Sequence, residues 1–175
     1  MANREALREL QSRLAARLQL ARTEARQASW LALECAGQGL LVPLATAGEI
    51  FPVGALKAVP HTQPWFLGVA NLRGGLHGVV DLAAFLGLRA PQAIDALREQ
   101  SRLLAFNAAL GSQCAVLVDR LAGLRNADQL QVEAPDGEPR PAFAPGQWRD
   151  ADGRRWQEID LGLLARSEPF LAIAA

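Results

Sequence analysis

Short apolar runs bounded by turn residues fill most of the chain after residue 28. SWLALEC (29–35) and LLVPL (40–44) are strand-like, and the AGQG between them is typical of a tight turn. This pattern predicts a β-hairpin. It returns about 73 residues later, where RLLAFNA (102–108) and CAVLVD (114–119) flank a second turn. The sequence therefore predicts two equivalent hairpins.

Each hairpin is followed by the same succession of elements. ATAGEIF (45–51) and DRLAGLRN (119–126) are similar tails, and VVDLAAFLGL (79–88) and EIDLGLLARS (158–167) each read as strand, acid and helix start. Asp81 and Asp160 stand where helix N-caps belong. We infer an internal duplication of two small β lobes, each with a short helix. Closed or nearly closed barrels would remove the exposed edges of such short strands.

The first 28 residues follow a different pattern. Residues 3–27 contain no Gly or Pro, and Leu7, Leu10, Leu14 and Leu18 recur at helical spacing. They predict an N-terminal helix, packed either on its own body or against another chain. The predicted organisation is a helical extension over 1–28 and a β domain over 29–175. Lobe one is expected at about 29–90 and lobe two at about 100–175.

Two segments interrupt the duplicated pattern. Residues 89–100 predict a short helix or a linker. Residues 133–156 are rich in Pro and Gly, and we expect mostly loop there, with turns at Asp136-Gly137 and Asp152-Gly153. The fold expected from the pattern is thus mainly β with short helices.

Composition and charge exclude several classes of protein. No apolar run approaches the roughly 20 residues of a membrane helix, and we expect a soluble, cytoplasmic protein. Six Arg and three Glu lie in residues 1–28, which leaves the rest of the chain with three more acids than bases and no basic face for nucleic acid. Cys35 and Cys114 lack metal or redox spacing and are expected to be buried filler.

Catalytic chemistry is poorly represented. The chain has no Tyr and only two His, of which His61 lies in a Pro-bounded loop and His77 in a predicted strand. DADG (150–153) resembles the start of a calcium loop, but the later ligands do not follow, and a turn explains it better. We expect no enzyme, no cofactor and no metal.

Arg73 stands out because glycines surround it in an apolar run, FLGVANLRGGLHGVVDL (66–82). This spacing predicts a tight turn between two strands with Arg73 at its exposed tip. An Arg there offers a fixed set of donors to carbonyls or carboxylates of a partner. An internal salt bridge, for example to Glu49, is the alternative, and the residues alone leave both open.

These motifs resemble those of a known family. WFLGVANLRGGLHGVVDLAAFLGL (65–88) is similar to the signature of CheW-like domains, as are LVPLATAGEIF (41–51) and CAVLVDRLAGL (114–124). The N-terminal helix, TQPWFLGVAN (62–71) and RSEPFLAIAA (166–175) resemble PilI-type adaptors of type IV pilus chemosensory systems more than flagellar CheW proteins. His77, Gly78 and Gly75 depart from the usual pattern, which has an apolar residue, a Pro and a β-branched residue at these positions.

The resemblance implies two SH3-like five-stranded β-barrel lobes around a shared hydrophobic seam, and no catalysis. It also implies a coupling adaptor between the cytoplasmic tip of a methyl-accepting chemoreceptor and the regulatory domain of a CheA-type histidine kinase, within membrane-bound receptor arrays. The expected output is control of type IV pili and twitching motility. Residue by residue it implies partner contacts for one group of positions and a helix-start role for Asp81; the contact positions are Glu49, Asn71, Leu72, Arg73 and Gly74.

Two functions of other classes are alternatives to the adaptor. A small-ligand-sensing double-barrel regulatory module would need a polar-lined cavity, which the sequence does not reveal. An oligonucleotide-binding barrel is disfavoured, because single-strand binding uses exposed aromatic residues interleaved with basic ones, and aromatic residues make up only 6% of the chain.

Overall fold

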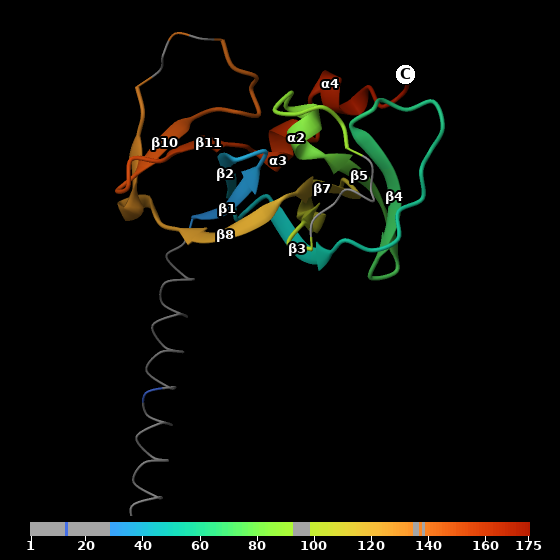
Figure 1. Ribbon diagram of the computed structural model, residues 1–175, viewed down its shortest axis with the longest axis horizontal. Helices are drawn as coiled ribbons and strands as arrows, with labels where there is room; N and C mark the ends of the chain where they lie inside the picture. The colour runs from blue at the N-terminus through green and yellow to red at the C-terminus, as the bar shows by residue number, and fades with distance from the viewer. Residues whose placement is uncertain (1–12, 14–28, 93–98, 135–136, 138) are drawn as a thin grey trace, which may run out of the picture.

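The computed structural model describes residues 13, 29–92, 99–134, 137 and 139–175 (Figure 1). Apart from residue 13, the predicted helix over 3–27 lies outside the described residues, and so does the middle of the predicted 89–100 segment. The strands are β1 (Trp30–Cys35), β2 (Gln38–Pro43), β3 (Ala47–Pro52), β4 (Phe66–Leu72), β5 (Gly75–Asp81), β6 (Arg102–Phe106), β7 (Cys114–Val118), β8 (Arg120–Arg125), β9 (Leu130–Val132), β10 (Gln147–Asp150) and β11 (Arg155–Glu158).

Short helices join or follow the strands. They are α2 (Leu82–Phe85), α3 (Leu161–Leu164) and α4 (Glu168–Leu171), with 3-10 turns η2 (Ala108–Leu110) and η3 (Ala127–Gln129). The described part of the chain is therefore mainly β with few short helices, as predicted. Both predicted hairpins form, β1–β2 and β6–β7, because each pair of apolar runs is separated by a turn that reverses the chain.

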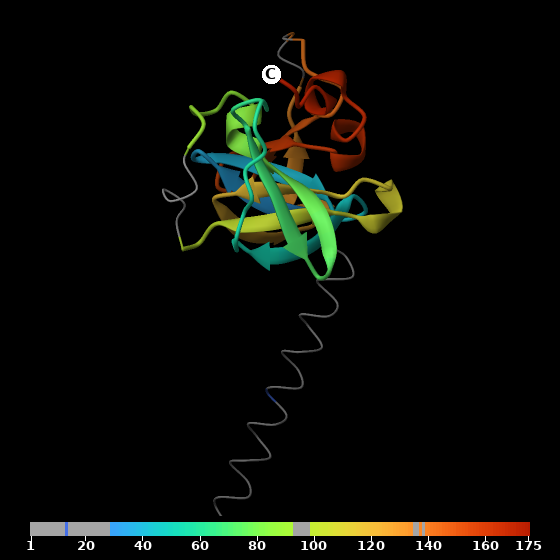
Figure 2. The ribbon, with the colours of Figure 1, turned by 90° about the vertical axis from the view of Figure 1, so that its right-hand side faces the viewer.

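The strands form two curled sheets that lie side by side (Figures 1 and 2). Sheet A has the order β8-β1-β2-β11-β10-β9, and sheet B has the order β3-β6-β7-β5-β4. All neighbours are antiparallel except β2 with β11 and β5 with β7, which are parallel.

The two sheets do not follow the predicted division of the chain at about residues 90–100. Sheet A contains the β1–β2 hairpin of the first repeat but takes its other strands from the second repeat. Sheet B contains the β6–β7 hairpin of the second repeat and takes its other strands from the first. Each sheet thus combines the hairpin of one repeat with the later strands of the other repeat, and neither half of the chain builds a sheet alone.

In each sheet, the segment that follows the third strand of a repeat crosses over and pairs with a strand farther along the chain. After β3 the chain crosses to β4, where the backbones of Lys57 and Val69 exchange two hydrogen bonds of 2.8 and 2.9 Å. At the equivalent place in the second repeat, β9 follows β8 and pairs with β10. Gly68 makes the first crossing possible, because its φ is +122° and a Cβ there would lie 2.2 Å from the Lys57 carbonyl oxygen.

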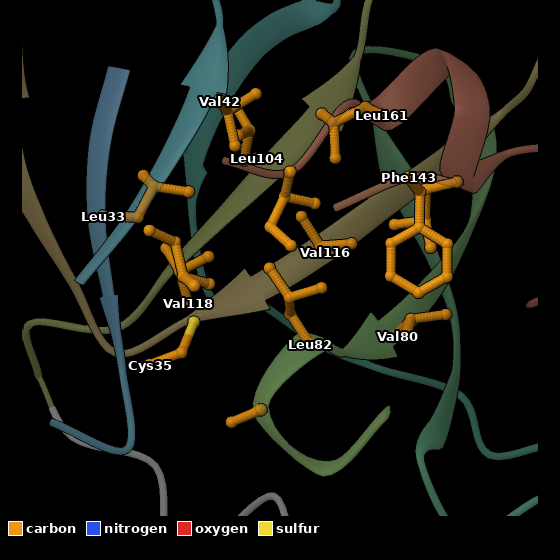
Figure 3. Close-up of a cluster of buried hydrophobic side chains, with 14 of the residues drawn as sticks. Leu33, Cys35, Val42, Val80, Leu82, Leu104, Val116, Val118, Phe143 and Leu161 are labelled. Atoms are coloured by element: carbon orange, nitrogen blue, oxygen red, sulfur yellow. The ribbon is translucent and has the colours of Figure 1, made fainter. Parts of the chain in front are cut away.

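The central hairpins are buried on both faces, which explains why their sequences are continuously apolar rather than alternating. Leu33 of β1 and Leu104 of β6 face a core shared by the two sheets. Leu41 of β2 faces a small core inside sheet A with Trp156, and Leu103 faces one inside sheet B. Figure 3 shows side chains from both sheets pointing into the shared core.

The Pro- and Gly-rich region is mostly loop in the described residues, as predicted, but it contains a strand that the sequence did not predict. Residues 147–150 form β10, which pairs with β11 so that Trp148 lies opposite Trp156. The intervening turn contains Gly153 at φ +80°, where a turn was predicted. Trp156 is buried in the core of sheet A and the partly buried Trp148 packs against that core, which helps to hold strands this short, whereas the turn residues around them obscured the strand pattern.

Candidate partner-binding surface

The β4–β5 hairpin presents Arg73 at a two-residue turn. Arg73 and Gly74 both have positive φ, +49° and +82°, the conformation of the turns that best match the twist of a hairpin. The side-chain oxygen of Asn71 accepts a hydrogen bond from the Gly74 amide at 2.8 Å and fixes the turn. The structure thus places Arg73 at an exposed tip, where the sequence predicts it.

Arg73 has an internal partner across the sheet. Its guanidinium lies 2.7 Å from the Glu49 carboxylate, and the side chains are 76% and 41% exposed. Glu49 belongs to β3, the strand at the opposite edge of sheet B, so the pair spans the open end of the curled sheet. Ion pairs this exposed contribute about 0–1 kcal/mol to stability, because water screens them. Both guanidinium and carboxylate stay available to a partner.

A shallow pocket of about 300 Å³ lies beside this ion pair. Phe51, Leu72 and Ala105 give it an apolar lining, and Glu49, Arg73, His77 and Asn107 give it a polar one. Leu76 is 61% exposed, but it directly precedes His77 on β5 and therefore points to the opposite face from the pocket. Within the pocket, an apolar lining bordered by charged and hydrogen-bonding groups is the usual composition of a protein interface.

The structure places the other predicted site residues away from this surface or beneath it. Leu72 is buried in the core of sheet B, so it shapes the turn from below. Asp81 is the N-cap of α2 and accepts a hydrogen bond from the Ala84 amide. Asp160 is the N-cap of α3 and accepts hydrogen bonds from the Gly162 and Leu163 amides.

The residues weighed for catalysis are not brought together. His77 lies on β5 and its Nδ1 is 3.0 Å from the Gly75 carbonyl, whereas His61 lies in the loop before β4. The DADG motif forms the turn between β10 and β11, where Asp150 accepts hydrogen bonds from the Asp152 and Arg154 amides. Within the residues that the structure describes, no group of His, Cys, Asp and Glu is arranged to hold a metal ion.

A buried ion-pair cluster that the sequence did not predict lies at the end of the shared core. Arg89 donates hydrogen bonds to both Asp81 and Asp119. Burial opposes the charge of Arg89, but the hydrogen bonds to the two carboxylates outweigh it and raise the pKa of the guanidinium. The only sequence signal is an Arg directly after the apolar segment LGL. Its two partners lie 8 and 30 residues away in sequence, too far for a local pattern to indicate them.

Sheet A carries a second group of polar contacts that the sequence did not reveal. Glu34 accepts hydrogen bonds from Arg120 and Arg154, and the bond from Arg120 lowers the pKa of Glu34 against the effect of burial. Arg154 and Arg125 also lie over the Trp156 ring, at 4.5 and 5.3 Å from its centroid. These contacts join β1, β8 and the β10–β11 hairpin, so their role is to stabilise sheet A.

Comparison with known proteins defines the class of the chain. Residues 29–168 match the CheW-like domain, and the chain belongs to this family. The crystal structure of the scaffolding protein TtCheW from Thermoanaerobacter tengcongensis has the same fold, with a TM-score of 0.65 at 18% identity, over 82% of this chain and 95% of that one.

A more particular relative is Protein PilI of Pseudomonas aeruginosa. The two chains are 29% identical over 114 residues, which cover 65% of this chain and 61% of the length of PilI. The family and the PilI-like resemblance predicted from the sequence are confirmed. None of the helices in the described residues has the length and apolar character needed to cross a membrane.

Proposed function

We propose that this protein is a non-catalytic adaptor that couples the cytoplasmic tip of a methyl-accepting chemoreceptor to the regulatory domain of a CheA-type histidine kinase. Its output is the control of type IV pili and twitching motility, and it works in the cytoplasm beside membrane-bound receptor arrays. Residues 29–175 form the adaptor domain, and residues 1–28 are an extension to it. Family membership over residues 29–168 and the likeness to PilI support this proposal.

The observation that carries the proposal is the exposed Arg73 on a rigid turn. A two-residue turn fixes the backbone, Asn71 fixes the turn, and the side chain still projects into solvent. A binding residue presented in this way loses little conformational freedom in the backbone when a partner arrives. In this proposal Glu49, Asn71, Arg73 and Gly74 contact the partner, and Leu72 supports them from the core.

The proposal is tested by reconstitution with purified partners. The full chain is mixed with the cytoplasmic domain of a chemoreceptor and with the regulatory domain of a CheA-type kinase from the same organism, singly and together, and sedimentation is measured. We expect two binary complexes and one ternary complex. If the chain fails to bind one of the two partners when that partner is tested singly, the result contradicts an adaptor role.

A charge exchange separates an internal role of the ion pair from a contact with the partner. In the double variant Arg73→Glu with Glu49→Arg, the two charges change places, so the internal ion pair can still form. If Arg73 contacts the partner, we expect weak binding in both single variants and no rescue in the double variant. Full rescue would assign the pair a purely internal role.

A small-ligand-sensing module is the second candidate, because the pocket beside Arg73 has both apolar and charged lining residues. A thermal-melt screen against small carboxylates and amino acids distinguishes it from the adaptor. The adaptor account expects no ligand to raise the melting temperature of the full chain. A dose-dependent rise that Arg73→Ala abolishes would favour the ligand module.

A further inference from the structure

A buried cluster of charges joins the two sheets beside α2. The guanidinium of Arg89 donates to Asp119 Oδ1 at 2.6 Å and to the two carboxylate oxygens of Asp81 at 2.9 and 3.1 Å. The side chain of Asp81 is fully buried, and those of Arg89 and Asp119 are largely buried. A planar guanidinium can span two carboxylates in this way, whereas an ammonium group acts as a point charge.

Each aspartate also accepts a hydrogen bond from a backbone amide, one in α2 beside sheet B and the other in a turn of sheet A. Asp81 ends β5 of sheet B and accepts a hydrogen bond from the Ala84 amide in α2. Asp119 Oδ2 accepts a hydrogen bond of 2.7 Å from the Ala36 amide, in the β1–β2 turn of sheet A. Ala36 has a φ of +50°, which is unfavourable for a residue with a Cβ, so this turn needs an external contact to hold it.

The described part of the second repeat shows no such cluster at the equivalent place. Asp160 accepts hydrogen bonds from the Gly162 and Leu163 amides, and no ion pair to it is found among the described residues. The β6–β7 turn is held instead by Asn107, whose side chain accepts from the Ala109 amide and donates to the Ala45 carbonyl. The charged contact is thus a feature of one end of the duplicated fold.

We propose that Arg89 is a positioning residue that holds the β1–β2 turn of sheet A and the start of α2 on sheet B in fixed relation to each other. It acts through Asp119 on one side and Asp81 on the other. Cys35, at the end of β1, is a further titratable neighbour of the cluster, and burial raises its pKa to about 12, so it stays neutral. Without the guanidinium, the two carboxylates would face each other in the core and move apart, one of them toward solvent.

Amide hydrogen exchange of the full chain tests this inference at the two ends of the cluster. We expect Arg89→Met to speed exchange of both the Ala36 and the Ala84 amides by tenfold or more, beyond any change at the Val116 amide in the core strand β7. Asp119→Ala should speed exchange at Ala36 alone. Arg102→Met is the matched control, because among the described residues Arg102 donates to the nearby Glu99 and Ser101 carbonyls and to no carboxylate.

Several results would overturn the inference. One is an Arg89→Met variant in which only one of the two amides changes, or in which both change no more than Val116. If this variant does not fold, Arg89→Lys decides the question, because an ammonium keeps the charge but lacks the planar fork of donors that fits both carboxylates. We expect Arg89→Lys to speed exchange of both amides relative to Val116. A change confined to one amide, or no change at either, would contradict the bridging role of the guanidinium.

Discussion

Arg73 occupies a backbone conformation that an arginine does not favour. A non-glycine residue at φ +49° costs roughly 1–2 kcal/mol, and Asn or Gly would fit this turn position better. The exposed ion pair with Glu49 offsets only part of that cost. An arginine is therefore kept at this position at some expense of stability, which is the expected mark of a residue used in binding rather than in folding.

Gly68 illustrates the opposite case, a residue fixed by the fold. We predict that Gly68→Ala destabilises the protein by more than about 2 kcal/mol, because a Cβ would strike the Lys57 backbone and φ +122° is nearly closed to other residues. Gly74→Ala is the control, since its Cβ meets open space and only its φ of +82° is strained, a cost of about 1 kcal/mol. Chemical denaturation measures the free energy of unfolding of both variants. Equal losses of stability would contradict the role of Gly68 in the crossing.

Glu34 provides a pH dependence whose sign follows from its contacts. Its pKa is lowered in the folded state by Arg120, so its contribution to stability is present above the usual glutamate pKa of about 4.3 and is lost as the pH falls through the folded value. We predict that Glu34→Gln lowers the free energy of unfolding at neutral pH. The difference from the parent protein should vanish in acid. A difference that persists unchanged at low pH would refute the prediction.

At the scale of elements, the two helix caps look alike in sequence but differ in the structure. We predict that Asp160→Ala costs about 1 kcal/mol, the usual cost of losing a cap. Asp81→Ala should cost clearly more, about 3 kcal/mol, because it also removes one carboxylate from the buried Arg89. The comparison is made by urea denaturation of the two variants. Equal losses of unfolding free energy in the two variants would mean that the Arg89–Asp81 ion pair adds nothing to stability.

Local patterns were enough to predict the hairpins and caps. In β1–β2, β6–β7 and β4–β5, the turn and both strands lie within a short segment, so spacing and turn residues determine the element. The β10–β11 hairpin was hidden because its strands are short and its stability comes from Trp148 and Trp156 rather than from an apolar run. Arg89 was missed for a similar reason, since Asp119 lies 30 residues away in sequence.

At the scale of the whole molecule, the duplication was predictable but its exchange between sheets was not. The repeat could be read from the recurring hairpin, yet the parallel pairs β2 with β11 and β5 with β7 join distant parts of the chain. Each pairing is selected by the shared core, in which side chains from both repeats pack together. No local signal in the sequence encodes that choice. The sequence left both an internal ion pair with Glu49 and a partner contact open for Arg73, and the structure contains the ion pair.

The central claim concerns the surface at Arg73. Binding of the chemoreceptor cytoplasmic domain to the full chain, measured by titration calorimetry, tests it most directly. The variants are Arg73→Ala, Arg73→Asp and, as matched control, Arg155→Asp, since Arg155 is an exposed ion-paired arginine on sheet A.

We predict that Arg73→Ala lowers the affinity by about 2 kcal/mol or more and that Arg73→Asp lowers it further, because the reversed charge adds repulsion. Thermal melts of both variants should stay close to that of the parent protein, and Arg155→Asp should bind as the parent does. Unchanged affinity in both Arg73 variants would contradict the claim, and so would an affinity loss matched by a large fall in melting temperature.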